Sequence, residues 1–219
     1  HKAIRRQRQM CIRDSNKGGI IVLAKDVGID LGTANILIYV KGEGIVLNEP
    51  SIVVVDTNEN KVIAMGNEAK EMIGKTPENI KVIKPLKDGV IADFEITELM
   101  LNNYIKRVKA KSLLTRPRVL ICCPSNITEV EKSAIIEAAE RTGARKVFIE
   151  EEPKVAAIGA GIKIKNPTGN MVIDIGGGTT DIAVLSMNNI VISSSLRIAG
   201  NTFDQDIICL LYTSDAADE

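Results

Sequence analysis

Residues 174–181 read Asp-Ile-Gly-Gly-Gly-Thr-Thr-Asp, and residues 30–35 read Asp-Leu-Gly-Thr-Ala-Asn. Each of these two glycine turns follows a short apolar run and leads into another. Apolar runs on both sides of a short turn predict a β-hairpin with the glycines at its tip. An aspartate precedes each tip, so the two predicted hairpins each present a carboxylate beside a glycine turn.

The composition narrows the class of protein. A length of 219 residues suits one large domain or a domain and a half, and 45% hydrophobic residues are enough for a core. The 28 basic and 28 acidic residues balance, and only 3% of residues are aromatic. Nucleic-acid surfaces are typically basic and carry aromatic stacking platforms, so we expect no nucleic-acid partner. No apolar run approaches the roughly 20 residues that a membrane span requires.

Histidine and cysteine chemistry is also restricted. The one histidine is His1, which argues against histidine-based triads and histidine-rich zinc sites. The cysteines are Cys11, Cys122, Cys123 and Cys209, and no two are separated by two residues. They are typical of buried, reduced thiols in a cytosolic protein.

The order of predicted elements indicates an α/β fold with a mixed sheet and flanking helices. The expected strands are Val27–Asp30, Ile36–Val40, Ile45–Leu47, Ser51–Val55, Lys61–Met65, Val119–Cys123, Lys146–Ile149, Met171–Asp174, Asp181–Ser186 and Ile190–Leu196. The expected helices are Glu68–Ile73, Ile96–Lys111, one that the capping box at Thr128 opens and that runs through Arg141 before Gly143 ends it, Val155–Ala160 behind Pro153, and one from Asn201.

The two glycine hairpins open successive copies of one unit, and this duplication predicts the domain organisation. We expect a first domain over 26–165, with a small inserted subdomain at about 48–95, and the start of a second over 166–209. Residues 1–25 and 210–219 differ in pattern from the rest. We expect a non-native or disordered leader and an artefactual tail that interrupts the last helix, with an ordinary basic arm and a frayed tail as the alternative.

The glycine turns suit a triphosphate, because glycine lets backbone N–H donors approach phosphate oxygens. Two carboxylates, Asp30 and Asp174, are placed to hold Mg²⁺ through its water shell. Hydrolysis also needs a group that orients a water molecule, and Glu152 is the best candidate. The alternative for each turn is an ordinary tight turn, and for Glu152 a solvated carboxylate at a helix start.

Several stretches carry a family resemblance. Both turns resemble the phosphate motifs of the actin/Hsp70/sugar-kinase superfamily, and 151–159 resembles its connector. The stretches 28–35, 48–51, 116–119, 124–131 and 197–201 resemble the MreB/Mbl family of bacterial actins, and the resemblance runs from about Asp26 to about Ile208. It implies an actin-like, ribonuclease H-like ATPase fold with a complete first copy and a truncated second.

The resemblance assigns roles to individual positions. Nucleotide contacts are expected from Gly32, Thr33, Ala34, Asn35, Gly176, Gly177, Gly178, Thr179, Thr180 and Gly200. Asp30 and Asp174 match the metal-side aspartates, and Glu152 matches the residue that positions the attacking water. Asn201 stands where the family often has aspartate, which weakens a charge-based role there.

The resemblance also implies a function. We expect a protein that binds ATP and Mg²⁺ and forms filaments with its own kind at the inner face of the cytoplasmic membrane, where it organises cell-wall synthesis and rod shape. Cell-wall synthesis and shape proteins are its expected partners, and its expected location is cytoplasmic and peripheral to the membrane. The adenosine-contacting half of the family pattern is missing, so we expect weak or no ATP hydrolysis from these 219 residues.

Two other functions share the phosphate turns. One is the nucleotide domain of an Hsp70-type chaperone, and the other is a sugar-kinase-like phosphotransferase. A kinase needs a catalytic aspartate, for which Asp181 is the one candidate, although Asp181 is more typical of a hairpin residue.

A basic segment around Leu113 and Leu114 has two interpretations. The residues alone favour two leucines that close the preceding helix against the core. The family resemblance favours an apolar tip inserted at anionic lipid, supported by the neighbouring cations.

Overall fold

The computed structural model describes residues 26–59, 61–87, 89–111, 116–125 and 127–213. Its largest sheet has five strands in the order β10-β9-β1-β2-β3. These strands are β1 (Asp26–Leu31), β2 (Asn35–Val40), β3 (Gly44–Pro50), β9 (Arg118–Cys123) and β10 (Lys146–Glu151). Strands β1, β2 and β3 are antiparallel, whereas β9 runs parallel to both β1 and β10. The predicted mixed sheet and the first glycine hairpin are therefore confirmed.

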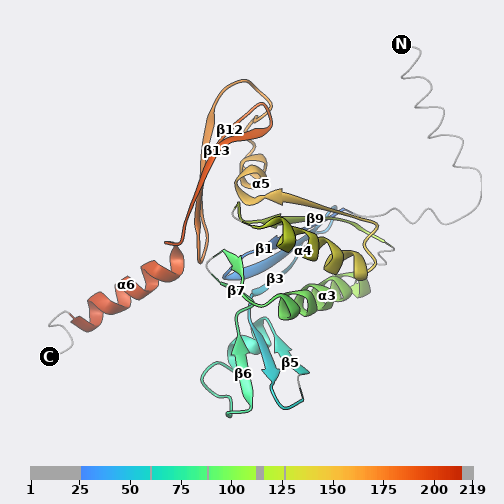
Figure 1. Cartoon of the computed structure of the whole chain (residues 1–219), viewed down its shortest axis with the longest axis vertical. Coiled ribbons are helices and arrows are strands. Elements are labelled where there is room, and N and C mark those ends of the chain that lie inside the picture. Colours follow the sequence, from blue (N-terminus) through green and yellow to red (C-terminus); the bar gives the residue numbers. More distant parts are fainter. Residues whose placement is uncertain (1–25, 60, 88, 112–115, 126, 214–219) are drawn as a thin grey trace, which may run out of the picture.

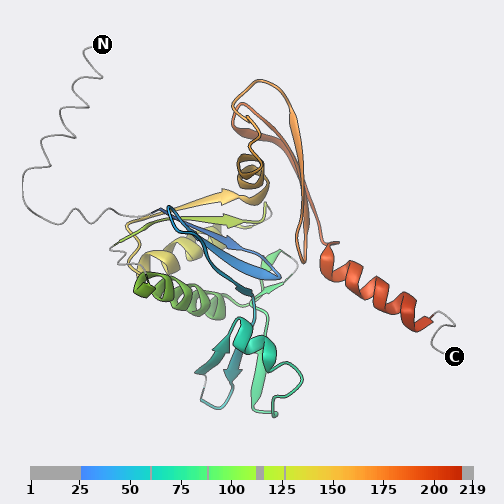
Figure 2. The same cartoon turned by 180° about the vertical axis from the view of Figure 1, so that it is seen from behind.

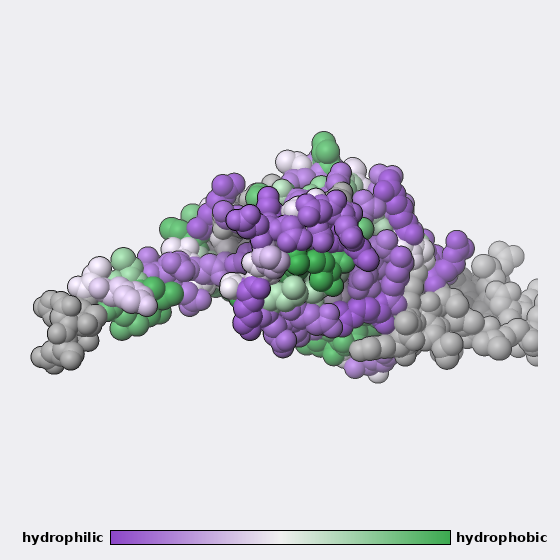
Figure 3. Space-filling model, turned by 90° about the horizontal axis from the view of Figure 1, so that it is seen from below, coloured by the Kyte–Doolittle hydropathy of each residue, from purple (hydrophilic) through white to green (hydrophobic). Residues whose placement is uncertain are grey.

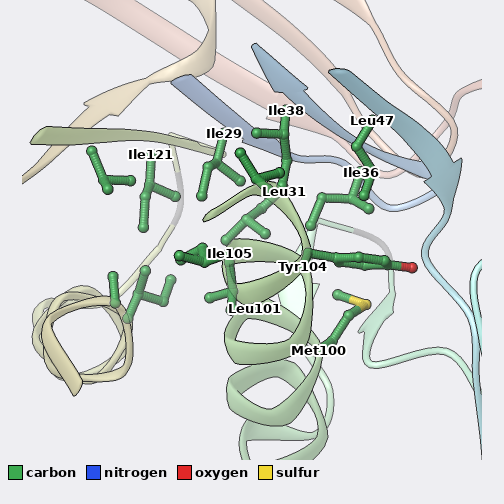
Figure 4. Packing of buried hydrophobic residues seen from close by; sticks show 14 of the residues in the cluster. Ile29, Leu31, Ile36, Ile38, Leu47, Met100, Leu101, Tyr104, Ile105 and Ile121 are labelled. Carbon is green, nitrogen blue, oxygen red and sulfur yellow. The ribbon is translucent and has the colours of Figure 1, made fainter. Parts of the chain in front are cut away.

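Helices α3 (Phe94–Lys111) and α4 (Glu129–Arg141) cover one face of this sheet (Figure 1). Figure 4 shows α3 side chains such as Leu101 and Tyr104 directed at Ile29 and Ile36 of the first hairpin. These four side chains are fully buried. The hydrophobic face of α3 therefore holds the β1–β2 hairpin, and with it the first glycine turn, in place.

The predicted capping box fixes the start of α4. The Glu131 N–H donates to Thr128 Oγ1 at 3.2 Å, and the Thr128 N–H donates to Glu131 Oε2 at 2.9 Å. Gly143, with φ of 85°, follows the end of the helix in the left-handed conformation that favours glycine. Both predicted ends of this helix agree with the structure.

A smaller sheet lies beside the large one (Figure 2). It has the order β5-β4-β6, with β4 (Val53–Asp56), β5 (Lys61–Met65), β6 (Ile80–Ile83) and the short helix α2 (Asn67–Glu71). Its core is separate and consists of Ile52, Val54, Ala64 and Ala69. A two-stranded ribbon, β7 (Leu86–Lys87) and β8 (Val90–Ile91), leads from this sheet back to α3.

The second glycine hairpin lies in a third sheet, of order β11-β12-β13. Its strands are β11 (Asn170–Ile175), β12 (Thr180–Ser186) and β13 (Asn189–Leu196). Helix α5 (Glu152–Gly159) begins directly after β10 and packs on this sheet through a small cluster of Ala157, Ile164 and Leu185. The antiparallel order β11-β12-β13 has the same topology as β1-β2-β3, which supports the second predicted hairpin.

Helix α6 (Gly200–Thr213) corrects one expectation. The sequence predicted a break at Leu210, but the helix continues to Thr213 because leucine and tyrosine are compatible with a helix, and Thr213 Oγ1 donates to the Cys209 carbonyl at 2.8 Å. None of its described residues is buried, and it points away from the three sheets (Figures 1 and 2). The view from below shows apolar residues along α6 beside a mainly hydrophilic face (Figure 3).

No helix in the described part of the chain is long and apolar enough to cross a membrane.

Candidate functional site

The two glycine turns line one cleft of about 440 Å³, although they come from different sheets. Asp30 is the second-last residue of β1, Asp174 is the second-last residue of β11, and Glu152 is the first residue of α5. The described lining consists of Asp30, Gly32, Thr33, Ala34, Asn35, Leu37, Cys122, Pro124, Glu152, Val155, Ala156, Asp174, Gly176, Gly177 and Thr179. Most of the residues that the sequence assigned to one site are thus together.

The turns approach each other closely at Gly177. A Cβ placed on Gly177 would lie 2.6 Å from Ala34 Cβ and 3.3 Å from Ala34 N. Real Cβ atoms do not approach other heavy atoms to 2.6 Å, so any side chain here would push the two turns apart. Glycine at this position is therefore a condition for the observed width of the cleft.

Hydrogen bonds from outside the cleft hold the first turn. Ser51 Oγ donates to the Gly32 carbonyl at 2.7 Å, and the Ser51 N–H donates to the Ala34 carbonyl at 3.0 Å. Ser51 is 1% exposed. Sequence reasoning did not assign it to the site, although Ser51 belongs to one of the stretches that carry the family resemblance.

The second turn is held by the start of α6. The Gly200 N–H donates to the Gly176 carbonyl at 3.1 Å, and the Asn201 N–H donates to the Gly177 carbonyl at 2.8 Å. Carbonyl oxygens repel anions, so their engagement by Gly200 and Asn201 favours an anion at the opposite side of the turn. Gly200, predicted as a nucleotide contact, lies behind the turn and supports it.

Two further predicted contacts do not line the cleft. Gly178 is absent from its described lining, and Thr180 Oγ1 donates to the Ile198 carbonyl at 2.6 Å. Several apolar or small residues that do line the cleft were not predicted as site residues, although Pro124, Val155 and Ala156 lie in stretches that carry the family resemblance; these lining residues are Leu37, Cys122, Pro124, Val155 and Ala156. Burial raises the pKa of the Cys122 thiol to about 12, and Asp30 and Glu152 add to the effect, so Cys122 is a protonated, inert wall residue.

Carboxyl groups concentrate at the floor of the cleft. Burial raises the pKa of Glu152 to about 8, with further contributions from the charges of Asp30, Asp181 and Asp174. Burial and then the charge of Asp174 raise the pKa of Asp30, and burial and then Asp181 raise that of Asp174. Carboxylates that lie close together and are shielded from water disfavour one another's ionisation. The floor of the cleft therefore attracts positive charge.

The carboxylate oxygens of the cleft suit a cation that keeps its water ligands. Glu152 Oε1 and Asp181 Oδ1 are buried with no hydrogen-bond partner in the described part of the chain. Among the described residues, no three acidic, histidine or cysteine side chains are grouped closely enough to hold a metal directly. Mg²⁺ keeps several waters when it binds protein, so Asp30 and Asp174 are suitable for contact through water.

Asp181 differs from its expected setting. It lies on β12 directly opposite Asp174, as a hairpin residue should, but it is only 2% exposed. The sequence pattern indicated its strand and could not show that α5 covers its side of the sheet.

Leu113 and Leu114, the proposed membrane contacts, lie outside the described residues.

Comparison with known proteins identifies close relatives. The sequence model of the MreB/Mbl protein family matches residues 24–214. The chain is 65% identical over 187 residues to the cell shape-determining protein Mbl of Bacillus cereus, covering 85% of this chain and 56% of that protein. It therefore spans about half the length of the curated relatives it matches.

Solved structures of MreB proteins also resemble this chain. Crystal structures of MreB5 of Spiroplasma citri bound to ADP and to AMPPNP are 47% identical to this chain, with TM-scores of 0.77 and 0.76. Each covers 84% of this chain, which corresponds to 55% and 56% of those chains. The expected actin-like fold is thereby confirmed, and the chaperone and sugar-kinase alternatives are not favoured. Because the family model matches residues 24–214, which include both glycine turns and the helices between them, the chain belongs to the MreB/Mbl protein family.

Proposed function

We propose that this protein binds ATP in the cleft between its two glycine turns and acts as a nucleotide-dependent bacterial actin. The observation that carries the proposal is the approach of Gly177 to Ala34, which brings two phosphate-binding turns together with Glu152 on the same cleft. The crystal structures of MreB5 bound to ADP and to AMPPNP support the choice of an adenine nucleotide.

The residues of the cleft have separate roles in this proposal. The backbone of the turns and the side chains of Thr33, Asn35 and Thr179 donate hydrogen bonds to phosphate oxygens. Asp30 and Asp174 hold Mg²⁺ through water, and the ion supplies positive charge that balances the acidic floor and the phosphates.

Glu152 orients the water that attacks the terminal phosphate. Its carboxylate must be ionised to accept a proton from that water, whereas burial and the neighbouring aspartates raise its pKa and so disfavour ionisation. Positive charge near Asp30 and Asp174 counters this effect, so the ionised form of Glu152 is favoured when nucleotide and cation are both bound.

At the cellular level we propose filaments that support cell shape. The relatives named as cell shape-determining proteins support this role. Self-association, attachment to the inner face of the cytoplasmic membrane through Leu113 and Leu114, and contact with cell-wall synthesis proteins follow from the family resemblance.

Sedimentation of the full-length protein tests the proposal. We expect pelleting that depends on ATP and Mg²⁺, with filaments visible by electron microscopy, and phosphate release that Glu152→Ala abolishes while ATP binding remains. A full-length protein that transfers phosphate to a small acceptor and never pellets would support the kinase alternative instead.

Membrane attachment needs its own experiment. We expect the full-length protein to sediment with liposomes that contain anionic lipid, and the double change Leu113→Ser and Leu114→Ser to reduce this binding. Unchanged liposome binding by the double variant refutes the proposed contact.

A further inference from the structure

Gly89, which directly precedes β8 in the β7–β8 ribbon, lies between the two glycine turns. Gly89, the residue before β8, donates its backbone N–H to Thr33 Oγ1 of the first turn at 3.3 Å. The same residue packs against the second turn, because a Cβ on Gly89 would overlap Thr179 Cγ2 and lie 3.4 Å from Thr179 Oγ1. One residue thus contacts a threonine from each turn, and both threonines line the cleft.

The hydrogen bond to Thr33 determines how that hydroxyl is used. A threonine hydroxyl has one proton to donate and two positions that accept. When the Gly89 N–H occupies an accepting position, the Thr33 proton must point elsewhere. Within the described residues Thr33 Oγ1 donates to no protein group, and its residue lines the cleft. The contact therefore favours Thr33 as a donor toward the cleft, which is the role that a phosphate oxygen requires.

We propose that Gly89 is a positioning residue of the phosphate site, which orients the Thr33 hydroxyl toward phosphate and sets the approach of Thr179 from the other turn. This inference rests on the proposed function, since it names a residue that prepares the same site. Gly89 acts through Thr33 and Thr179 and needs no contact with the nucleotide.

The position requires glycine for two separable reasons. Its φ is 73°, in the left-handed region that residues with side chains rarely adopt. Its Cα also faces Thr179 with no room for a methyl group. Gly74 provides a matched control, because its φ is 74° and a Cβ there would meet no atom within 4 Å.

The ribbon also links the site to the rest of the fold. It lies in the chain between β6 of the small sheet and helix α3, so the small sheet is connected to both turns through Gly89. A change in the spacing of the turns must move Gly89 or break its contacts.

The test measures dissociation constants for ATP and ADP, with thermal unfolding, in full-length variants. Gly74→Ala is expected to lower the unfolding temperature and to leave ATP affinity unchanged, because it adds backbone strain alone. Gly89→Ala is expected to weaken ATP binding about tenfold or more, the size of a lost hydrogen bond to a charged group.

Two double variants separate positioning from general damage. Thr179→Ser removes Cγ2 and keeps the hydroxyl, so adding it to Gly89→Ala should restore much of the lost ATP affinity. Thr33→Val removes the hydroxyl that Gly89 orients, so Gly89→Ala added to Thr33→Val should weaken ATP binding by less than Gly89→Ala alone. If Gly89→Ala does not fold, the Gly89→Ala and Thr179→Ser double variant gives the comparison with Gly74→Ala.

The outcomes are distinguishable. If the parent protein binds ATP and Gly89→Ala binds it as tightly as Gly74→Ala does, the positioning role is wrong and the proposed function stands. Failure of Thr179→Ser to restore any affinity in folded protein also overturns the role. If the parent binds neither ATP nor ADP, the proposed function itself is wrong.

Discussion

At the scale of single residues, Glu152 has the most unusual environment in the cleft. Its side chain is largely shielded from water, Oε1 has no hydrogen-bond partner among the described residues, and three aspartates act on its charge. A solvated carboxylate at a helix start would have none of these features. The environment supports the role in water orientation over the alternative considered from sequence.

The raised pKa of Glu152 predicts a pH effect on stability in nucleotide-free, chelator-treated protein. The unfolded chain releases this proton near pH 4.5, whereas the folded protein keeps it up to about pH 8. The folded state binds more protons between these values, so this contribution to stability is present below about pH 4.5 and is lost as pH rises to about 8. Glu152→Gln removes the effect.

Thermal unfolding of parent and Glu152→Gln across pH 5 to 9 checks this prediction. The variant should gain stability relative to the parent as pH rises, by an amount on the order of 1 kcal/mol or more, since one pKa unit corresponds to about 1.4 kcal/mol. The difference at pH 5 serves as the internal control. A difference that is equal at pH 5 and pH 9 contradicts the assigned environment.

At the scale of elements, strand β9 lies inside the large sheet, next to edge strand β10. Its neighbours are β1 and β10, and Ile121 on its core face is 0% exposed beneath the helices (Figure 4). Truncating such a side chain leaves a cavity in a packed interior. We predict that Ile121→Ala lowers the free energy of unfolding by roughly 2–5 kcal/mol in chemical denaturation.

Ile45 is the matched control for that prediction. It is also an isoleucine in the large sheet, on edge strand β3, but it is 64% exposed. Ile45→Ala should change the free energy of unfolding by no more than about 0.5 kcal/mol. Equal effects from the two substitutions would show that the described core is wrong.

The capping box of α4 gives a second prediction at this scale. Thr128→Ala removes the acceptor for the Glu131 N–H and should lower the free energy of unfolding by about 1 kcal/mol. Thr76→Ala, in a loop where the described structure gives the side chain no hydrogen bond, should have little effect. Chemical denaturation of both variants decides the point, and a loss no larger than that of Thr76→Ala would count against the cap.

Short sequence patterns predicted those helices and strands whose signals lie within the element or its turn. The two hairpins follow from apolar runs around glycine, and α4 follows from Thr128 and Glu131. The end of α6 was missed because a helix-compatible run of Leu210, Leu211 and Tyr212 looked like an interruption. Contacts between distant segments, such as Ser51 with Gly32 or Gly89 with Thr179, have no local signature. They could be known only from the fold.

At the scale of the whole molecule, the cleft lies where two sheets meet. The first turn belongs to the five-stranded sheet and the second to the β11-β12-β13 sheet, with α5 connecting them. The family resemblance predicted which residues meet there, and most of them do. The lining from Leu37, Cys122 and Val155 depends on how the sheets pack, so composition and motif spacing could not give it.

The claim that the two turns together form the phosphate site is tested most directly by calorimetric titration of ATP and Mg²⁺ into the full-length protein and its Gly177→Ala variant. The parent should bind ATP, and Gly177→Ala, with its added methyl against Ala34, should bind at least about tenfold more weakly in protein that still folds. Equal ATP affinity in parent and folded Gly177→Ala would contradict the account.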